Sequence, residues 1–203
     1  GGRVDAATQI KDAILDSKVP TVAFINKRAI SAGALISLSC EKVFMAGGAT
    51  IGATTAVDMQ GNKASEKVIS YMREEMAATA EKRGRDKYIA RGMVDEELEF
   101  PNKVMKEFIN DGEVIDTIKT KVYYLVIDGD TVTVDDIEGR KQGNLITLTT
   151  EQSLKYKIAD ASIENFEAVL DTLGFSNLVV NKTTENWSEN FVRFLTNPVV
   201  ASL

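Results

Sequence analysis

The chain has 203 residues, 44% hydrophobic and 27% charged, with one cysteine, no histidine and a formal net charge of −6. The absence of histidine excludes a Ser-His-Asp triad, a Cys-His pair and an HExxH metal site, and a single cysteine excludes internal disulfides and cysteine-rich zinc sites. The acidic charge argues against nucleic acid as a partner, and no apolar run approaches the roughly 18 to 20 residues that a spanning helix needs.

The first part of the chain, to about Val57, alternates between helical and strand patterns. Apolar residues at helical spacing predict a helix from Val4 to Ile14 that ends before Pro20. Residues 21–25 predict a buried strand, residues 31–38 a short buried helix capped by Ser31, and residues 43–46 a second strand. Repeated units of this kind predict an α/β domain with parallel strand pairing.

The next segment, residues 47–56, is rich in glycine but lacks the spacing of a phosphate loop. We interpret it as tight turns around a crevice. An amphipathic helix is predicted from Ser65 to Arg83, ending at Gly84, and a second helix from Asp86 to Arg91.

The pattern changes beyond Pro101, and we treat residues 100–145 as an insertion. Strands over residues 122–127 and 131–134, joined by an Asp-Gly-Asp turn, predict an inserted β-hairpin. Helices are predicted to start at the cap Thr150 and to span about residues 163–173. Apolar and aromatic residues within 184–203 predict a C-terminal helix, either docked on the domain or lying at a membrane interface ahead of a membrane region.

Serine paired with lysine is the nucleophile-base combination that remains without histidine. Ser31 is the best nucleophile candidate because it lies between a strand and a helix, and its small neighbours Ala32 and Gly33 allow a substrate carbonyl to approach. The N–H groups at the start of a helix can stabilise an oxyanion. The alternative interpretation of Ser31 is an ordinary helix cap.

The candidate base has to be a lysine whose pKa is lowered by burial or by positive neighbours. Lys67 precedes Val68 and Ile69 at the start of the amphipathic helix, and we expect apolar surroundings for it. Lys82 and Lys87 lie among charged residues and meet that condition less well.

Four blocks follow one another along the chain: GGRVDAA from Gly1, PTVAFIN from Pro20, ISAGALI from Ile30 and MAGGATIGA from Met45. A further block starts at Leu145 and continues through Asp160. In this order the blocks closely resemble the NfeD family, membrane-bound serine proteases of the ClpP class. The resemblance covers residues 1 to about 98 and resumes at Leu145.

The resemblance implies an α/β fold, a ClpP- or crotonase-like spiral of ββα units, in a protease domain over residues 1–183. It implies a serine endopeptidase with a Ser-Lys dyad of Ser31 and Lys67, the latter rather than Lys63, and no metal or organic cofactor. It also implies an oxyanion hole and a substrate-binding segment. The oxyanion hole is formed by Gly2 and Ala32, and substrate is bound by Gly1, Gly33, Thr50, Ile51 and Gly52.

By the same resemblance the substrate is an apolar peptide segment, such as the hydrophobic tail of a stomatin-like membrane partner. It is expected to bind as an added strand along the groove near Thr50 to Thr55. The parent protein is expected to be a membrane-anchored homodimer with this domain on the extracytoplasmic side. The chain is then a fragment that lacks the first strand and helix expected before Gly1.

Several positions depart from the family pattern. Lys27 stands where glycine is frequent, Ile30 where alanine is common, and Gly47 and Ala56 where prolines are usual. None of them removes a dyad residue, but Ile30 is expected to narrow the site.

Two other functions stay open at this point. A catalytically inactive ClpP-like module would bind a stomatin-like partner without cleaving it. A crotonase-type enzyme would act on acyl-CoA with the same paired N–H groups and no dyad, although the sequence has no basic cluster suited to a nucleotide phosphate.

Overall fold

The computed structural model describes residues 4–55, 57, 62–97, 105–110, 113–119, 124–127, 130–133, 143–175, 179–181 and 183. The chain divides into two compact units, Gly1–Val169 and Leu170–Leu203. The predicted C-terminal helix over 184–203 lies outside the described residues. The predicted domain boundary at 183–184 coincides with the last described residue, 183. The candidate site belongs to the first unit.

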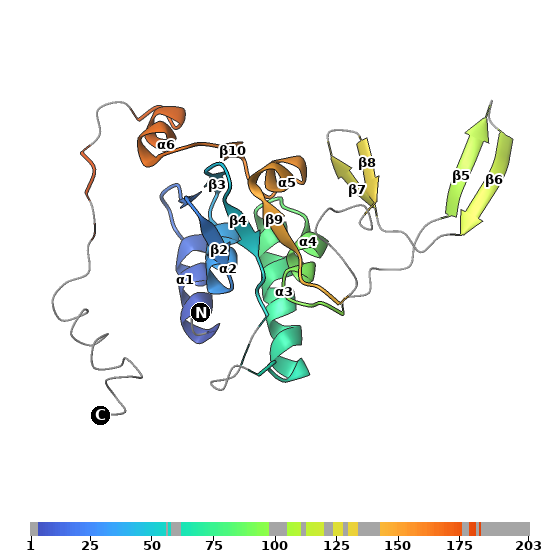
Figure 1. Cartoon of the computed structure of the whole chain (residues 1–203), viewed down its shortest axis with the longest axis horizontal. Coiled ribbons are helices and arrows are strands. Elements are labelled where there is room, and N and C mark those ends of the chain that lie inside the picture. Colours follow the sequence, from blue (N-terminus) through green and yellow to red (C-terminus); the bar gives the residue numbers. More distant parts are fainter. Residues whose placement is uncertain are drawn as a thin grey trace. The chain divides into compact units, whose positions relative to one another are not determined.

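One small sheet is fully parallel (Figure 1). Its strands are β1 (Val22–Ile25), β3 (Lys42–Met45) and β10 (Ala161–Ser162), in the order β1-β3-β10. Three of the four residues of the central strand β3 are buried, whereas three of the four residues of the edge strand β1 are only half-buried. The predicted parallel pairing of an α/β domain is confirmed.

The second small sheet is mixed and was not predicted. It consists of β2 (Arg28–Ile30), β4 (Thr50–Gly52) and β9 (Thr147–Thr149), with β4 in the centre. Strand β4 pairs in parallel with β2 and antiparallel with β9. The interpretation of residues 47–56 as turns alone is therefore wrong, because its central three residues are a strand paired on both sides.

The helices largely match their predicted positions. Gly84, with a φ of 70°, follows the long helix, and the Asp86 carboxylate caps the next one by accepting the N–H groups of Tyr88 and Ile89 at 2.8 Å. The fifth helix is capped by Thr149, one residue before the predicted cap, in a reciprocal capping box with Gln152. The helices are α1 (Val4–Leu15), α2 (Ala32–Ser39), α3 (Glu66–Lys82), α4 (Lys87–Gly92), α5 (Thr150–Lys155) and α6 (Phe166–Thr172).

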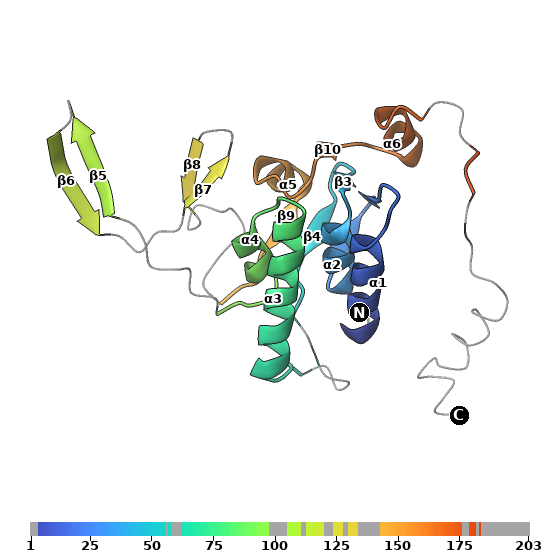
Figure 2. The same ribbon diagram turned by 180° about the vertical axis from the view of Figure 1, so that it is seen from behind.

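Helix α2 is the centre of the core. Figures 1 and 2 show α1 beside α2 and α4 beside α3, and α2 also contacts α3 and strands of both sheets. Leu35 and Leu38 of α2 are fully buried and join a core that includes Met45 of β3, Ile51 of β4 and Met76 of α3. Five of the eight α2 residues are buried, as expected of a short helix that is apolar on most sides.

The segment predicted as an insertion contains two antiparallel hairpins. Strands β7 (Tyr124–Ile127) and β8 (Asp130–Thr133) form the predicted hairpin. Strands β5 (Met105–Asn110) and β6 (Glu113–Lys119) form a hairpin that was not predicted, with a register shift between Phe108 and Ile109.

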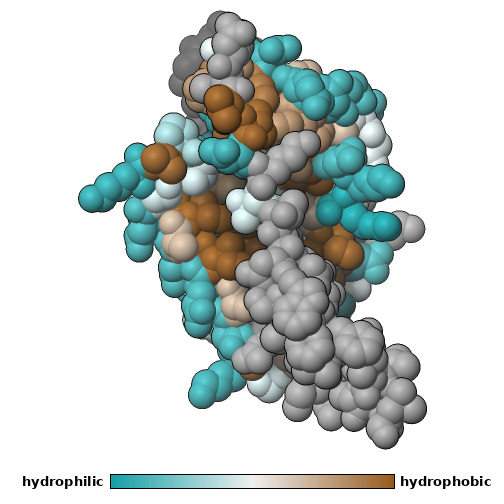
Figure 3. All heavy atoms as spheres, turned by 90° about the vertical axis from the view of Figure 1, so that its left-hand side faces the viewer, coloured by the Kyte–Doolittle hydropathy of each residue, from teal (hydrophilic) through white to brown (hydrophobic). Residues whose placement is uncertain are grey.

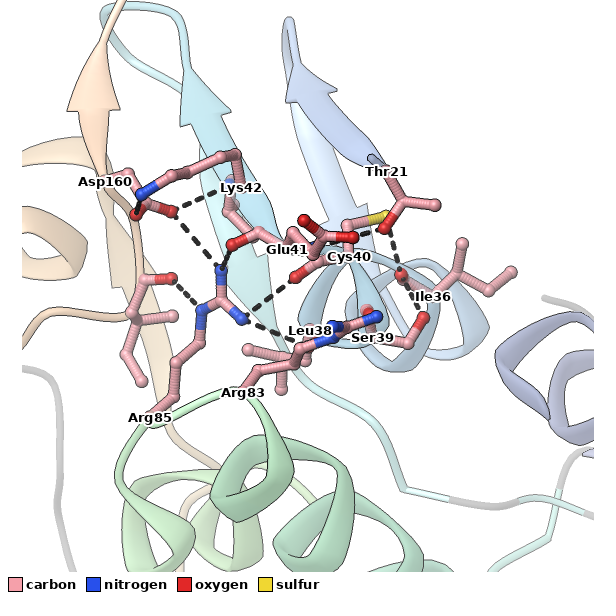
Figure 4. Close-up of polar contacts among 12 residues, drawn as sticks. Thr21, Ile36, Leu38, Ser39, Cys40, Glu41, Lys42, Arg83, Arg85 and Asp160 are labelled. Carbon is pink, nitrogen blue, oxygen red and sulfur yellow. Dashed lines mark hydrogen bonds and ion pairs between the residues drawn. The ribbon is translucent and has the colours of Figure 1, made fainter. Parts of the chain in front are cut away.

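A buried arginine, Arg85, joins segments that are far apart in the chain (Figure 4). Its side chain follows α3 and is only 7% exposed. Its guanidinium donates hydrogen bonds of 3.0 to 3.3 Å to four backbone carbonyls, those of Leu38, Cys40, Glu41 and Ile158. The end of α2 and the segment before β10 are therefore both attached to Arg85.

Asp160 completes this contact. Its carboxylate accepts hydrogen bonds from Arg85 at 3.3 Å, from the N–H of Val43 at 2.8 Å and from Lys42 at 3.0 Å. Burial lowers the pKa of Arg85, and attraction to Asp160 works in the opposite direction. A buried cation with satisfied donors is costly to remove, because its partners are left without a donor.

We expect the Arg85→Met variant to lower the free energy of unfolding by about 3–5 kcal/mol, because Asp160 and four carbonyls lose their shared donor. Urea unfolding followed by circular dichroism measures this change. The matched control is Lys82→Gln, an exposed cation at the end of α3, which we expect to change stability by no more than about 0.5 kcal/mol. Equal unfolding midpoints for the two variants would contradict the conclusion that Arg85 attaches the end of α2 and the segment before β10.

Candidate functional site

Ser31 occupies a strained turn between β2 and α2. Its φ of 56° and ψ of −129° lie in a region that residues other than glycine rarely adopt, at a cost of about 1–3 kcal/mol. An ordinary N-cap serine has extended backbone angles and accepts a hydrogen bond from its helix, whereas the Ser31 side chain makes no capping hydrogen bond. The capping interpretation therefore does not account for Ser31.

The end of β4 holds the strained turn in place. The N–H of Ser31 donates to the carbonyls of Gly52 at 3.2 Å and Ala53 at 3.1 Å. Gly52 itself has a φ of 136°, and a Cβ there would lie 2.9 Å from Thr147 Cα and collide with the Ile146 carbonyl. The backbone that supports Ser31 consequently requires glycine at this position.

The predicted oxyanion donor Ala32 is half-buried and is the first residue of α2. The first N–H groups of a helix have no partner within the helix, so this position offers donors beside Ser31. Gly33 is also half-buried, and a Cβ there would meet only Ala29 Cβ, at an ordinary 3.8 Å. Gly1 and Gly2, the other predicted contributors, lie outside the described residues.

Lys67 lies in the first turn of α3 and is exposed. The expectation that apolar neighbours surround it is wrong in this structure, because Ile69, Met72 and Met76 face the core and Lys67 faces solvent. Within the described part of the chain, no hydrogen bond joins Lys67 Nζ to Ser31 Oγ. Ala32, next to Ser31, and Val68, next to Lys67, both pack against the hydrophobic core of the unit.

The rejected alternative, Lys63, is already engaged. Its Nζ donates to Glu96 Oε1 at 2.7 Å, and this hydrogen bond raises the pKa of Lys63. A raised pKa keeps a lysine protonated at neutral pH, and an ammonium group cannot accept a proton. The hydrogen bond to Glu96 therefore argues against Lys63 as a base.

The predicted substrate-binding strand needs a correction. Both edges of β4 are occupied, by Arg28–Ile30 on one side and Thr147–Thr149 on the other, so a peptide cannot add to Thr50, Ile51 or Gly52 as a further strand. The N–H of Thr54 is also bonded, to the Met93 carbonyl at 2.7 Å. What Gly52 does in this structure is support Ser31, a role that the sequence reasoning missed.

The only cysteine is not a second nucleophile candidate. Cys40 is 5% exposed, and burial raises the pKa of its thiol. Because the thiolate is the reactive form, Cys40 is core packing at the end of α2.

The family assignment follows from sequence comparison. The NfeD1b N-terminal domain family matches residues 1–115, which include the Ser31 turn and all of α3. The chain belongs to the NfeD family. Over its whole length it is 30% identical to the membrane protein NfeD1b of Bacillus subtilis. Over 92% of its length it is 25% identical to the membrane-bound protease PH1510 of Pyrococcus horikoshii.

The chain spans 38% and 45% of the length of these two NfeD relatives. Both are membrane proteins by name, whereas no helix among the residues described for this chain has the length and apolarity to cross a bilayer.

Solved structures show the same α/β fold. A mutant of the 1510-N membrane-bound stomatin-specific protease, in complex with a substrate peptide, is 20% identical with a TM-score of 0.63. The 1510-N protease of Pyrococcus horikoshii, specific for a stomatin homolog, is 19% identical with a TM-score of 0.56. Each match covers 97% of this chain and 78% of the solved one.

We expect Gly52→Ala to destabilise the domain more than Gly48→Ala does. Both glycines have positive φ, so both substitutions carry a backbone cost of about 1–2 kcal/mol. A Cβ at Gly48 meets no atom within 4 Å, whereas at Gly52 it displaces the Ile146–Thr147 backbone. Urea midpoints of the two variants measure the difference. Equal destabilisation would contradict the close approach of Gly52 to the Ile146–Thr147 backbone.

Proposed function

We propose that this NfeD chain is a serine endopeptidase domain with a ClpP- or crotonase-like spiral fold and Ser31 as its nucleophile. The observation that carries the proposal is the backbone of Ser31. A serine in a strained strand-to-helix turn, without a capping hydrogen bond, is typical of a nucleophile presented to substrate.

The proposed reaction uses only protein groups. Ser31 Oγ attacks the peptide carbonyl while neutral Lys67 takes its proton, and the N–H groups of Ala32 and Gly2 hold the oxyanion. Lys67 then donates the proton to the leaving amine, and water hydrolyses the acyl-enzyme with the same lysine as base.

Substrate has to complete the dyad in this proposal. Lys67 is exposed and makes no hydrogen bond with Ser31 among the described residues, and catalytic hydrogen bonds often tighten only in the substrate complex. An apolar peptide seated over the start of α3 displaces water from Lys67 and so favours its neutral form, the form that accepts a proton.

Exposed apolar side chains beside both dyad residues support an apolar substrate. Ile30, directly before Ser31, is 49% exposed, and Tyr71, one helical turn after Lys67, is 47% exposed. The relation to a stomatin-specific protease extends this proposal to the hydrophobic segment of a stomatin-like membrane partner. The domain would act outside the cytoplasm, as part of a membrane-anchored homodimer.

One observation favours a second candidate, a ClpP-like module that binds such a partner without cleaving it. This observation is the lack of a hydrogen bond between Ser31 and Lys67 in the described structure.

Cleavage of an apolar fluorogenic peptide distinguishes these two functions. We expect Ser31→Ala to abolish cleavage, and Lys67→Ala to lower kcat by about 10²–10⁴-fold through loss of the general base. Lys63→Ala is the matched control and should retain activity, because its amine is held by Glu96. Full activity of the Lys67→Ala protein would contradict the dyad.

A further inference from the structure

A hollow of about 480 Å³ lies beside the Ser31 turn. It is lined by the end of β1, the turn into β2 and the first two turns of α2. Its apolar lining residues are Phe24, Ile25, Ala29, Gly33 and Ile36. Ser31 does not itself line the hollow, but Ala29 and Gly33, each two residues from Ser31 in the chain, do.

Two cations, Lys27 and Arg28, also line the hollow, and both are exposed. Several other basic residues of this unit pair with acidic ones, as Lys87 does with Glu81 at 2.8 Å and Arg91 with Glu74 at 2.6 Å. Among the described residues, neither Lys27 nor Arg28 has such a partner. In a chain with a net charge of −6, this pair is a local positive site at an apolar hollow.

We propose that the hollow binds the C-terminal end of an extended apolar peptide, with its terminal carboxylate at Lys27 and Arg28. This inference rests on the proposed function, because the peptide would be a substrate, or the acyl product that Ser31 releases. The volume falls within the range of about 300–1,000 Å³ for small-molecule sites, enough for one or two aliphatic side chains.

The lining explains why the anion should be a chain end. An acidic side chain would bring a polar residue into apolar surroundings, whereas a terminal carboxylate adds charge to a peptide whose side chains are all apolar. Strand β2, which carries Arg28, is an edge strand of its sheet among the described residues, so its backbone can also pair with an extended peptide.

The test measures binding in the Ser31→Ala protein, so that cleavage plays no part. Fluorescein-labelled apolar hexapeptides with a free C-terminal acid or a C-terminal amide are titrated by fluorescence anisotropy at low ionic strength. We expect the acid to bind about three- to tenfold more tightly than the amide. This is the gain expected from two partly solvated contacts of the carboxylate, with Lys27 and with Arg28. The double substitution Lys27→Gln and Arg28→Gln should remove this preference.

Lys18→Gln is the matched control, since Lys18 is exposed and does not line the hollow. Equal binding of acid and amide, or a preference that survives the double substitution, overturns the inference. Displacement of the peptide by dodecanoate at lower concentration than by the unlabelled acid peptide would assign the hollow to a fatty acid and also overturn it.

The two proposals fail separately. If the unmodified chain cleaves both peptides and shows no binding preference, the peptidase proposal stands and the carboxylate site is contradicted. A preference for the acid without cleavage supports the site and contradicts the peptidase.

Discussion

The fold depends on helix α2 being held at both ends. At its C-terminal end the buried Arg85 guanidinium donates to the carbonyls of Leu38 and Cys40, and at its N-terminal end the N–H of Ser31 donates to the carbonyls of Gly52 and Ala53. Both anchors come from segments distant in the chain. The strained backbone of Ser31 is therefore maintained by tertiary contacts, which is how sparsely populated angles persist at functional sites.

Some basic residues in the described part of the chain pair with carboxylates, and others do not. Lys11 is one of the paired residues, and its ion pair with Glu75 joins α1 to α3. Burial lowers the pKa of Lys11, but its hydrogen bonds to Asp12 and Glu75 outweigh burial, so that the pKa is raised. Lys67, Lys27 and Arg28 make no such pairs. Lys27 and Arg28 lie shortly before Ser31 in the chain, whereas Lys67 lies in the first turn of α3.

How far the sequence predicts the structure depends on whether a feature is local. The long helix α3 follows from its helical periodicity, and strands β1 and β3 follow from short apolar runs. Strands β2, β4 and β9 have three residues each, too few to show a pattern. The β5–β6 hairpin was missed although an Asp-Gly pair follows Asn110. Ser31 was identified because its turn is local. The sequence does not predict that Gly52 supports Ser31 or that Lys67 is exposed, because both features depend on how distant segments pack.

The most direct test of the central claim is the site and rate of reaction with a fluorophosphonate, a reagent that labels activated serines. Peptide mass spectrometry should find the adduct on Ser31, formed about a hundredfold or more slowly when Lys67 is alanine and at an unchanged rate when Lys63 is alanine. An adduct confined to other serines, no adduct at all, or equal rates with and without Lys67 would contradict the account.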